Sequence, residues 1–343
     1  MKKKLNQKTY GFVLSYINIF ISTMVGILFT PYMISSLGPT EYGLYQLLYA
    51  AIGYISLLDF GLGSTLTRFI LKYQSENDVE KERTVISMCI KIYCIFGLIA
   101  LAGVALAGCN LDILFSGSIT AENVDYAQKL FFIMGVTTSI SLISHALSGI
   151  QTAYEKHLVT KGIYTARLLL RVVVIFILLK LRIGAMAIVV ADLLVTIFLL
   201  LFDVIYCKVA LKTTFIYGEF DKSLFKALFS FSSYVFLQII ITQTNTGIDR
   251  MLLGVFSTLE VVALYGIITQ LSAMFSSVSN VVCSVTFPQI SRVVFANADR
   301  TTLTECCARY SRYQLFISAP LMGGFILFGK LFDFKLAGRA VWP

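Results

Sequence analysis

Long apolar segments separated by short polar connections dominate the chain. Runs of about 20 apolar residues recur along it, and a helix of about 20 residues crosses the roughly 30 Å hydrocarbon core of a bilayer. The pattern predicts about nine transmembrane helices. They are placed near residues 10–33, 42–66, 86–108, 127–150, 161–181, 184–206, 230–253, 262–287 and 310–330. The sequence therefore predicts an all-α integral membrane protein, a polytopic helix bundle.

Positive charge gathers on alternate connections. The connections at residues 34–41, 110–123 and 254–261 contain no Lys or Arg, whereas the N-terminus and the opposite connections are rich in both. Only the tight turn at residues 180–182 breaks this alternation. Because Lys and Arg are enriched on the cytoplasmic side of membrane proteins, we expect a cytoplasmic N-terminus. The net charge of +9 is interpreted as topological information, and no nucleic-acid partner is expected.

Composition supports the membrane interpretation and argues against metal chemistry. Only 14% of the residues are charged, and the mean hydropathy is +0.80, whereas soluble domains carry about 25% charged residues. The 7 cysteines show no CxxC or CxxH spacing, and the 2 histidines, His145 and His157, lie in different segments. We therefore expect no disulfide framework, no metal site and no cofactor.

One face of the seventh predicted span is polar along its length. Its polar residues recur at intervals of three and four positions, the spacing of a single helical face. They are Gln238, Thr242, Asn245 and Asp249, with Arg250 in the adjacent row. Weaker stripes in the first two spans contain Asn18 and Ser22, and Tyr45 and Tyr49. Interhelical hydrogen bonds would account for such stripes, and a water-filled substrate path is the alternative that the length of the longest stripe favours.

Two neighbouring spans carry opposite charges at similar depth. Arg171 lies about ten residues into the fifth span and Asp192 about eight residues into the sixth, which runs in the opposite direction. A charge at the middle of a bilayer costs at least about 2.5–3.5 kcal/mol unless it is paired or hydrated. We therefore predict an Arg171–Asp192 ion pair. Arg167 precedes Arg171 by one turn, so this helix offers two cations to an anionic substrate.

Residues 57–70 read LLDFGLGSTLTRFI and include the DFG triplet that binds metal in protein kinases. The other kinase motifs are missing from the sequence, and the triplet ends an apolar span. Asp59 is therefore interpreted as a structural or coupling charge, like Asp192. Arg68 lies at the cytoplasmic end of the span, where it is either a candidate contact for an anionic head group or a membrane-interface anchor.

The first and seventh spans resemble each other. Both begin at a tyrosine, cross a polar-striped helix and leave through a short uncharged turn to a glutamate. Repeated halves are common in transporters, whose substrate path lies between them. We predict an N-terminal bundle of about six helices at residues 1–206, a cytoplasmic linker at 207–229, and an incomplete second bundle of about three helices at 230–343.

The most specific family signal spans residues 37–69 and reads LGPTEYGLYQLLYAAIGYISLLDFGLGSTLTRF. This stretch resembles the N-terminal signature of bacterial polysaccharide-biosynthesis (O-antigen, Wzx-type) flippases of the MOP transporter superfamily. Residues 248–265 resemble the seventh helix of that family and its exit, and the resemblance extends over residues 10–330. It implies a larger two-bundle fold in the bacterial inner membrane. Because the family continues beyond this point, the chain is expected to be truncated at its C-terminus.

The resemblance also implies a function. Such proteins move undecaprenyl-diphosphate-linked oligosaccharides across the membrane by alternating access, in the biosynthesis of lipopolysaccharide and other surface polysaccharides. Cationic residues of the central cavity are implied to meet the pyrophosphate. Membrane lipids, a polysaccharide polymerase and assembly proteins are the implied partners. No catalytic residue is expected, and the chain is predicted not to be an enzyme.

Two alternatives remain open at this stage. A cation-coupled multidrug or small-molecule exporter of the same superfamily would bind its cation at Asp59, Asp192 or Asp249. A membrane-embedded glycan polymerase or transferase would need catalytic carboxylates or a large extramembrane loop. The predicted loops here are short, which favours the transporter readings.

Overall fold

A computed structural model describes residues 2–115, 118–119, 123–181, 183–213, 221–270, 272–273, 275–276, 279 and 300–337. The elements of these ranges are helices, which confirms the predicted all-α class. The first group is α1 (Lys2–Leu37), α2 (Pro39–Ile55), the 3₁₀ helix η1 (Ser56–Asp59), α3 (Leu62–Ser75), α4 (Val79–Gly108) and α5 (Leu111–Leu114). The second group is α6 (Val124–Ala153), α7 (His157–Leu179), α8 (Met186–Val209), α9 (Lys222–Phe256) and α11 (Arg300–Ala337).

Among the described residues, seven segments are long and apolar enough to cross a membrane. They are Ile17–Leu37, Pro39–Ser75, Val79–Gly108, Val124–Ala153, Leu158–Leu179, Met186–Val209 and Lys222–Asn245. These segments match the first seven predicted spans. The shorter apolar helix Leu259–Gln270 begins the eighth predicted span, the later part of which lies outside the described residues. The ninth predicted span lies within α11.

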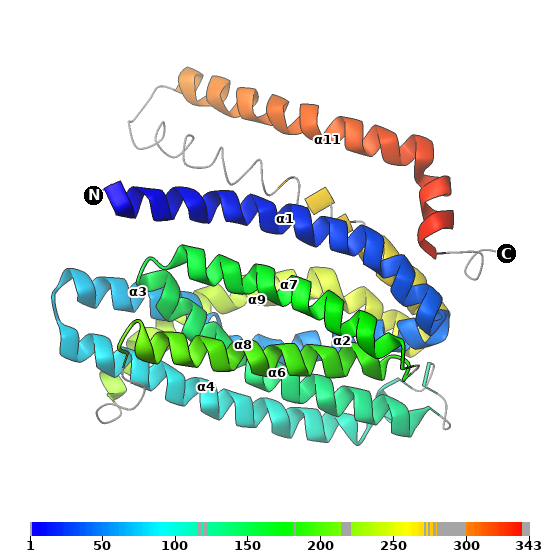
Figure 1. The fold of residues 1–343 in the computed structure, drawn as a ribbon, viewed down its shortest axis with the longest axis horizontal. Helices are drawn as coiled ribbons and strands as arrows, with labels where there is room; N and C mark the ends of the chain where they lie inside the picture. Colours follow the sequence, from blue (N-terminus) through cyan, green and yellow to red (C-terminus); the bar gives the residue numbers. More distant parts are fainter. Residues whose placement is uncertain are drawn as a thin grey trace.

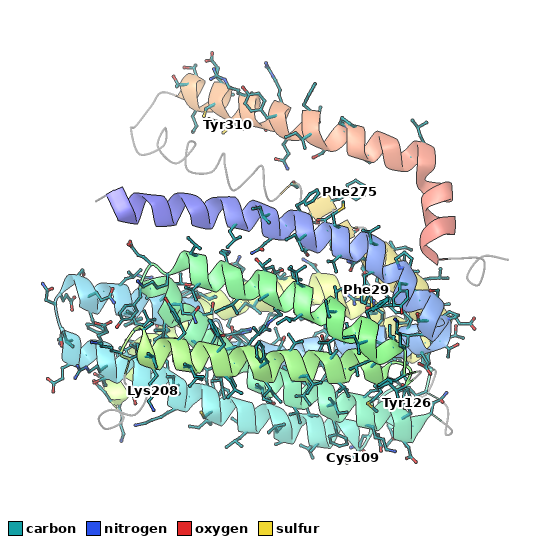
Figure 2. The ribbon with its side chains drawn as sticks, in the orientation of Figure 1. Phe29, Cys109, Tyr126, Lys208, Phe275 and Tyr310 are labelled. Atoms are coloured by element: carbon teal, nitrogen blue, oxygen red, sulfur yellow. The ribbon has the colours of Figure 1, made fainter. Side chains whose placement is uncertain are left out.

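The helices run back and forth along a common direction (Figure 1). Cys109 and Tyr126 lie at one end of the bundle, and Lys208 lies at the opposite end (Figure 2). Helix α6 packs against α3, α4 and α8, helix α1 packs on α7, and α9 packs on α2. Helix α11 lies beyond α1, on one side of the bundle (Figure 1).

Two apolar clusters fill opposite ends of the bundle. One contains Tyr42 and Leu48 of α2 with Phe131 of α6. The other contains Leu66 of α3 with Leu147, further along α6. The middle of both segments lies between the clusters and carries their polar side chains, so the fold places a polar layer between two dry ends.

The prediction of one continuous helix over residues 42–66 is wrong in detail. Helix α2 ends at Ile55, and Phe60 and Gly61 adopt left-handed conformations with φ of 48° and 65° before α3 begins. A Cβ atom on Gly61 would lie 2.3 Å from Val235 of α9, so the break also depends on close contact with another helix. The Phe60 ring, turned out by the break, stacks on Phe236 at a centroid distance of 4.0 Å.

The predicted linker at residues 207–229 is also shorter than expected. Helix α8 continues to Val209, and α9 already begins at Lys222. Asp221 fixes that start, because its carboxylate accepts hydrogen bonds from the backbone N–H groups of Ser223 and Leu224. These bonds, together with one from the Ser223 hydroxyl, lower the pKa of Asp221. A capping carboxylate of this kind is a start signal that overrides the polar composition of the segment.

Candidate functional site

A cavity of about 260 Å³ lies among α1, α2, α7, α9 and the helix Leu259–Gln270. Its aromatic and charged lining consists of Phe29, Tyr42, Tyr45, Tyr49, Arg171 and Arg250. Phe29 lies where α1 faces α7 (Figure 2). Since α9 begins the predicted second half of the chain, this first cavity is bounded by both halves of the sequence repeat.

The tyrosines form a row along one face of α2. The Tyr45 ring centroid lies 6.4 Å from that of Tyr42 and 6.0 Å from that of Tyr49. Tyr42 and Tyr45 are buried, whereas Tyr49 is 53% exposed. The row therefore leads from the packed end of the bundle to an accessible ring.

Arg171 and Asp192 form the predicted ion pair. The Nε atom of Arg171 lies 2.5 Å from Oδ1 of Asp192, and Nη2 lies 3.1 Å from Oδ2. The same Nη2 donates to the hydroxyl of Tyr45 at 3.0 Å. We call these three residues the Arg171 cluster. Two parallel N–H···O bonds fix the guanidinium plane, so the cluster holds the tyrosine row of α2 against α7 and α8.

Arg250 is held by a neutral side chain. Its Nη1 donates to Oε1 of Gln46 at 3.0 Å, and Nε2 of Gln46 donates to the hydroxyl of Tyr42 at 2.6 Å. Sequence analysis missed Gln46, although it follows Tyr42 by four residues on the same face. A buried amide that accepts from an arginine and donates to a tyrosine links the two halves at the cavity wall.

A second cavity of about 300 Å³ adjoins the first. It is lined by α2, η1, α6 and α9, and Tyr49 and Arg250 line both cavities. Ser56 and Ser141 contribute hydroxyls to its wall. Tyr49 and Arg250 are therefore the boundary between two polar spaces.

Most of the predicted stripe on α9 lies elsewhere. Gln238, Thr242, Asn245 and Asp249 are exposed, and they line neither cavity. Asp249 accepts a hydrogen bond from Tyr265. The face of α9 that meets α2 carries Gly254, where a Cβ atom would lie 2.1 Å from Leu47, so close approach of the helices selects this row.

The other predicted residues divide between contact and cavity positions. Ser22 lines the first cavity. Asn18 is buried between α1 and α7, donating to the carbonyl of Lys161 at 3.0 Å and accepting from Thr165. Arg68 lies over the ring of Phe231 at 4.2 Å. Arg167 is partly buried on α7 and lines neither cavity.

Asp59 lies where η1 ends, and it joins three elements. Its Oδ1 accepts from the hydroxyl of Tyr93 on α4 at 2.8 Å and lies 3.0 Å from Nδ1 of His145 on α6. We call these residues the Asp59 cluster. Sequence analysis named neither partner for this aspartate, because the three residues come from separate segments.

A second buried carboxylate was also missed. Asp203 of α8 accepts from Nε2 of Gln151 at 2.6 Å, and both side chains are buried. The signal available was an ionisable residue within the apolar sixth span, which typically marks a buried polar contact.

A family model described as "polysaccharide biosynthesis protein" matches residues 10–294. The chain belongs to this polysaccharide biosynthesis protein family. Curated proteins gave no significant match. The fold of this family member is similar to solved transporter structures, and it is a multi-pass membrane protein.

One similar structure is the inward-facing conformation of a multidrug resistance MATE family transporter of the MOP superfamily. It aligns with a TM-score of 0.65 and 15% identity, over 94% of this chain and 73% of that chain. A ligand-bound structure of the MATE multidrug transporter DinF-BH gives 0.67 and 13%, over 94% and 77%. A MOP superfamily transporter from Pyrococcus furiosus Vc1 gives 0.60 and 17%, over 96% and 76%. The chain covers 62% of a further matched structure. At these identities the likeness establishes the fold.

Proposed function

We propose that the protein moves oligosaccharides linked to a polyprenyl diphosphate across the bacterial cytoplasmic membrane, with its N-terminus in the cytoplasm. One observation carries the proposal: a guanidinium group and a row of tyrosines line the same cavity between the two halves of the chain. Guanidinium N–H groups match phosphate oxygens in geometry and charge. Tyrosine supplies a flat apolar face and a hydroxyl, both of which suit a sugar ring.

Arg250 is the residue best suited to bind the diphosphate. A phosphate oxygen that replaces Oε1 of Gln46 exchanges one acceptor for another and adds an opposite charge. The same exchange at Arg171 would remove the two bonds that this arginine makes to Asp192. A carboxylate left without its partner inside the membrane is costly. We therefore assign diphosphate binding to Arg250 and positioning of the tyrosine row to Arg171.

Tyr49 is the side chain best placed to contact the glycan. It is the exposed member of the row and lines both cavities, beside Arg250. A lipid-linked oligosaccharide has its first sugar next to the diphosphate, so a ring close to the guanidinium fits that order of groups. Ser22 and the hydroxyls of the second cavity supply further hydrogen-bonding partners for sugars.

Family membership favours this substrate over the two alternatives. The family is defined by polysaccharide biosynthesis, whereas the fold alone is shared with multidrug transporters. The family and the fold are those of membrane transporters, so we propose that the protein is not an enzyme. In this setting the expected partners are a polysaccharide polymerase and its assembly proteins.

Translocation of a fluorescent lipid-linked oligosaccharide in proteoliposomes tests the proposal. We expect Arg250→Gln to slow translocation about tenfold or more, because it removes a charge-assisted contact of about 1.5–3 kcal/mol. Arg309→Gln is the matched control, because Arg309 is exposed on α11 and lines neither cavity. Drug export without sugar transfer would identify an exporter, and sugar turnover without leaflet transfer would identify an enzyme.

A further inference from the structure

The Asp59 cluster lies one helical turn beyond the second cavity. Ser56 and Ser141 line that cavity. Asp59 follows Ser56 by three residues, and His145 follows Ser141 by four along α6, so each lies on the same side of its helix as a cavity residue. The His145 side chain is 50% exposed, whereas that of Asp59 is 18% exposed. A histidine thus stands between a polar cavity and a largely buried carboxylate.

We propose that Asp59 and His145 form a proton-binding site, and that its occupancy couples proton movement to transport. The coupling rests on the transport function proposed above, whereas the site itself does not. Uptake of one proton from water converts a neutral imidazole beside a carboxylate into an imidazolium–carboxylate ion pair, and release of that proton restores the neutral ring. Histidine suits this role because it changes charge near neutral pH.

The surroundings make this pair the centre of any charge change. Among the described residues, the elements packed against η1 are α2, α4, α6 and α9. Their ionisable side chains at this point are Tyr93 from α4 and His145 from α6. Helix α9 presents the rings of Phe229 and Phe236 against Phe60. On this side the site is closed by aromatic rings, so the second cavity is the polar route to it.

The backbone at this site explains how protonation is transmitted. Asp59 immediately precedes the two left-handed residues that separate α2 from α3. Just beyond the break, α3 is fastened to α6 by the Thr67 hydroxyl, which donates to the carbonyl of Gly149 at 2.9 Å. A stronger Asp59–His145 contact fastens η1 to the same helix. Occupancy by a proton therefore changes how firmly the break is tied to α6, while α9 contacts the break from the other half of the repeat.

Histidine NMR tests the site without any transport measurement. The chain has 2 histidines, so in a His157→Asn background the signals of ¹⁵N-histidine report on His145 alone. In lipid nanodiscs we expect one titration step, and we expect Asp59→Asn to displace its midpoint. Asp112→Asn makes the same chemical change on α5, away from the site, and is expected to leave the midpoint in place. A midpoint that is equal in all three proteins would overturn the assignment.

Translocation in proteoliposomes tests the coupling. We expect the wild-type rate to change about threefold or more between about pH 5 and pH 8, the interval in which histidine changes charge. His145→Asn and His145→Gln should lose that dependence, and His157→Asn should keep it. If both His145 variants retain the wild-type pH profile, the coupling is wrong. If the wild-type protein moves no lipid-linked sugar at any pH, the function proposed above fails, and the proton site is judged by NMR alone.

Discussion

The Arg171 cluster and the Asp59 cluster show two ways of keeping charge inside the same helical bundle. Arg171 and Asp192 face each other through two bonds of 2.5 and 3.1 Å, and a full positive charge meets a full negative one. Asp59 is held by a tyrosine hydroxyl and a histidine ring, each through a single contact. The first arrangement keeps its charges at any physiological pH. The second includes a group that changes charge there.

The difference follows from the neighbouring elements. Arg171 and Asp192 lie on adjacent, continuous helices, α7 and α8, which hold a fixed geometry. Asp59 lies at a break in the chain, where η1 meets α4, α6 and α9. A rigid pair suits positioning of a substrate cavity, whereas a hinge-like position suits a site whose occupancy alters packing. The following predictions test this contrast, from the largest expected effect to the smallest.

Breaking the Arg171–Asp192 pair should have the largest effect. Arg171→Ala leaves Asp192 without its cation, so we expect a loss of about 2–4 kcal/mol in unfolding free energy, towards the low end of values for buried pairs because both side chains are partly exposed. Unfolding of the purified protein in lipid nanodiscs measures the loss.

The double variant Arg171→Met/Asp192→Leu is the control for this prediction. It removes both charges together, so we expect it to be more stable than Arg171→Ala. A double variant that is as unstable as the single one would contradict a charge-pair origin. The exchange Arg171→Asp/Asp192→Arg should recover part of the stability for the same reason.

Adding a methyl group beside the Asp59 cluster should cost less. A Cβ atom on Gly149 would lie 2.6 Å from the carbonyl oxygen of Gly63, so Gly149→Ala pushes α3 away from α6. We expect a loss of about 1–3 kcal/mol and a change in the pH profile of translocation. Gly103→Ala is the matched control, because no atom lies within 4 Å of its added methyl group. Equal stability of the two variants would show that α3 and α6 separate freely.

Removing single hydroxyl groups compares the two clusters directly. Tyr93→Phe deprives Asp59 of its donor, and we expect a loss of about 1 kcal/mol. Tyr45→Phe removes an acceptor from Arg171, which keeps both bonds to Asp192, so we expect about 0.5 kcal/mol. Thermal unfolding of both variants in the same detergent measures the order, and the reverse order would contradict the contrast.

A carboxylate outside the membrane gives the smallest effect and the reference for the others. Because hydrogen bonds lower the pKa of Asp221, its capping contribution is present above the ordinary aspartate range near pH 4 and is lost as the pH falls through the lowered value. At pH 7 we expect Asp221→Ala to raise hydrogen exchange only in the first turns of α9. Faster exchange throughout α9 would show that the cap stabilises the whole helix.

Much of this molecule could be predicted from residues that act locally. The membrane helices follow from hydropathy, because each must bury about 20 apolar residues in lipid regardless of its neighbours. The Arg171–Asp192 pair was also predictable, since two unpaired charges at equal depth on consecutive helices are costly. The family signal at residues 37–69 is likewise a property of the sequence, and the match over residues 10–294 agrees with it.

Only the tertiary structure determined which polar residues face each other. Contact with α2 selects the row of α9 that carries Arg250 and leaves Asp249 exposed, because the polar positions on that helix cover a wide arc. The partners of Asp59 come from α4 and α6, and no spacing along the chain relates them. The break at Gly61 depends on its fit against Val235. Sequence determined which segments enter the membrane, and packing determined which of their polar atoms meet, because lipid selects for composition whereas a contact selects for position.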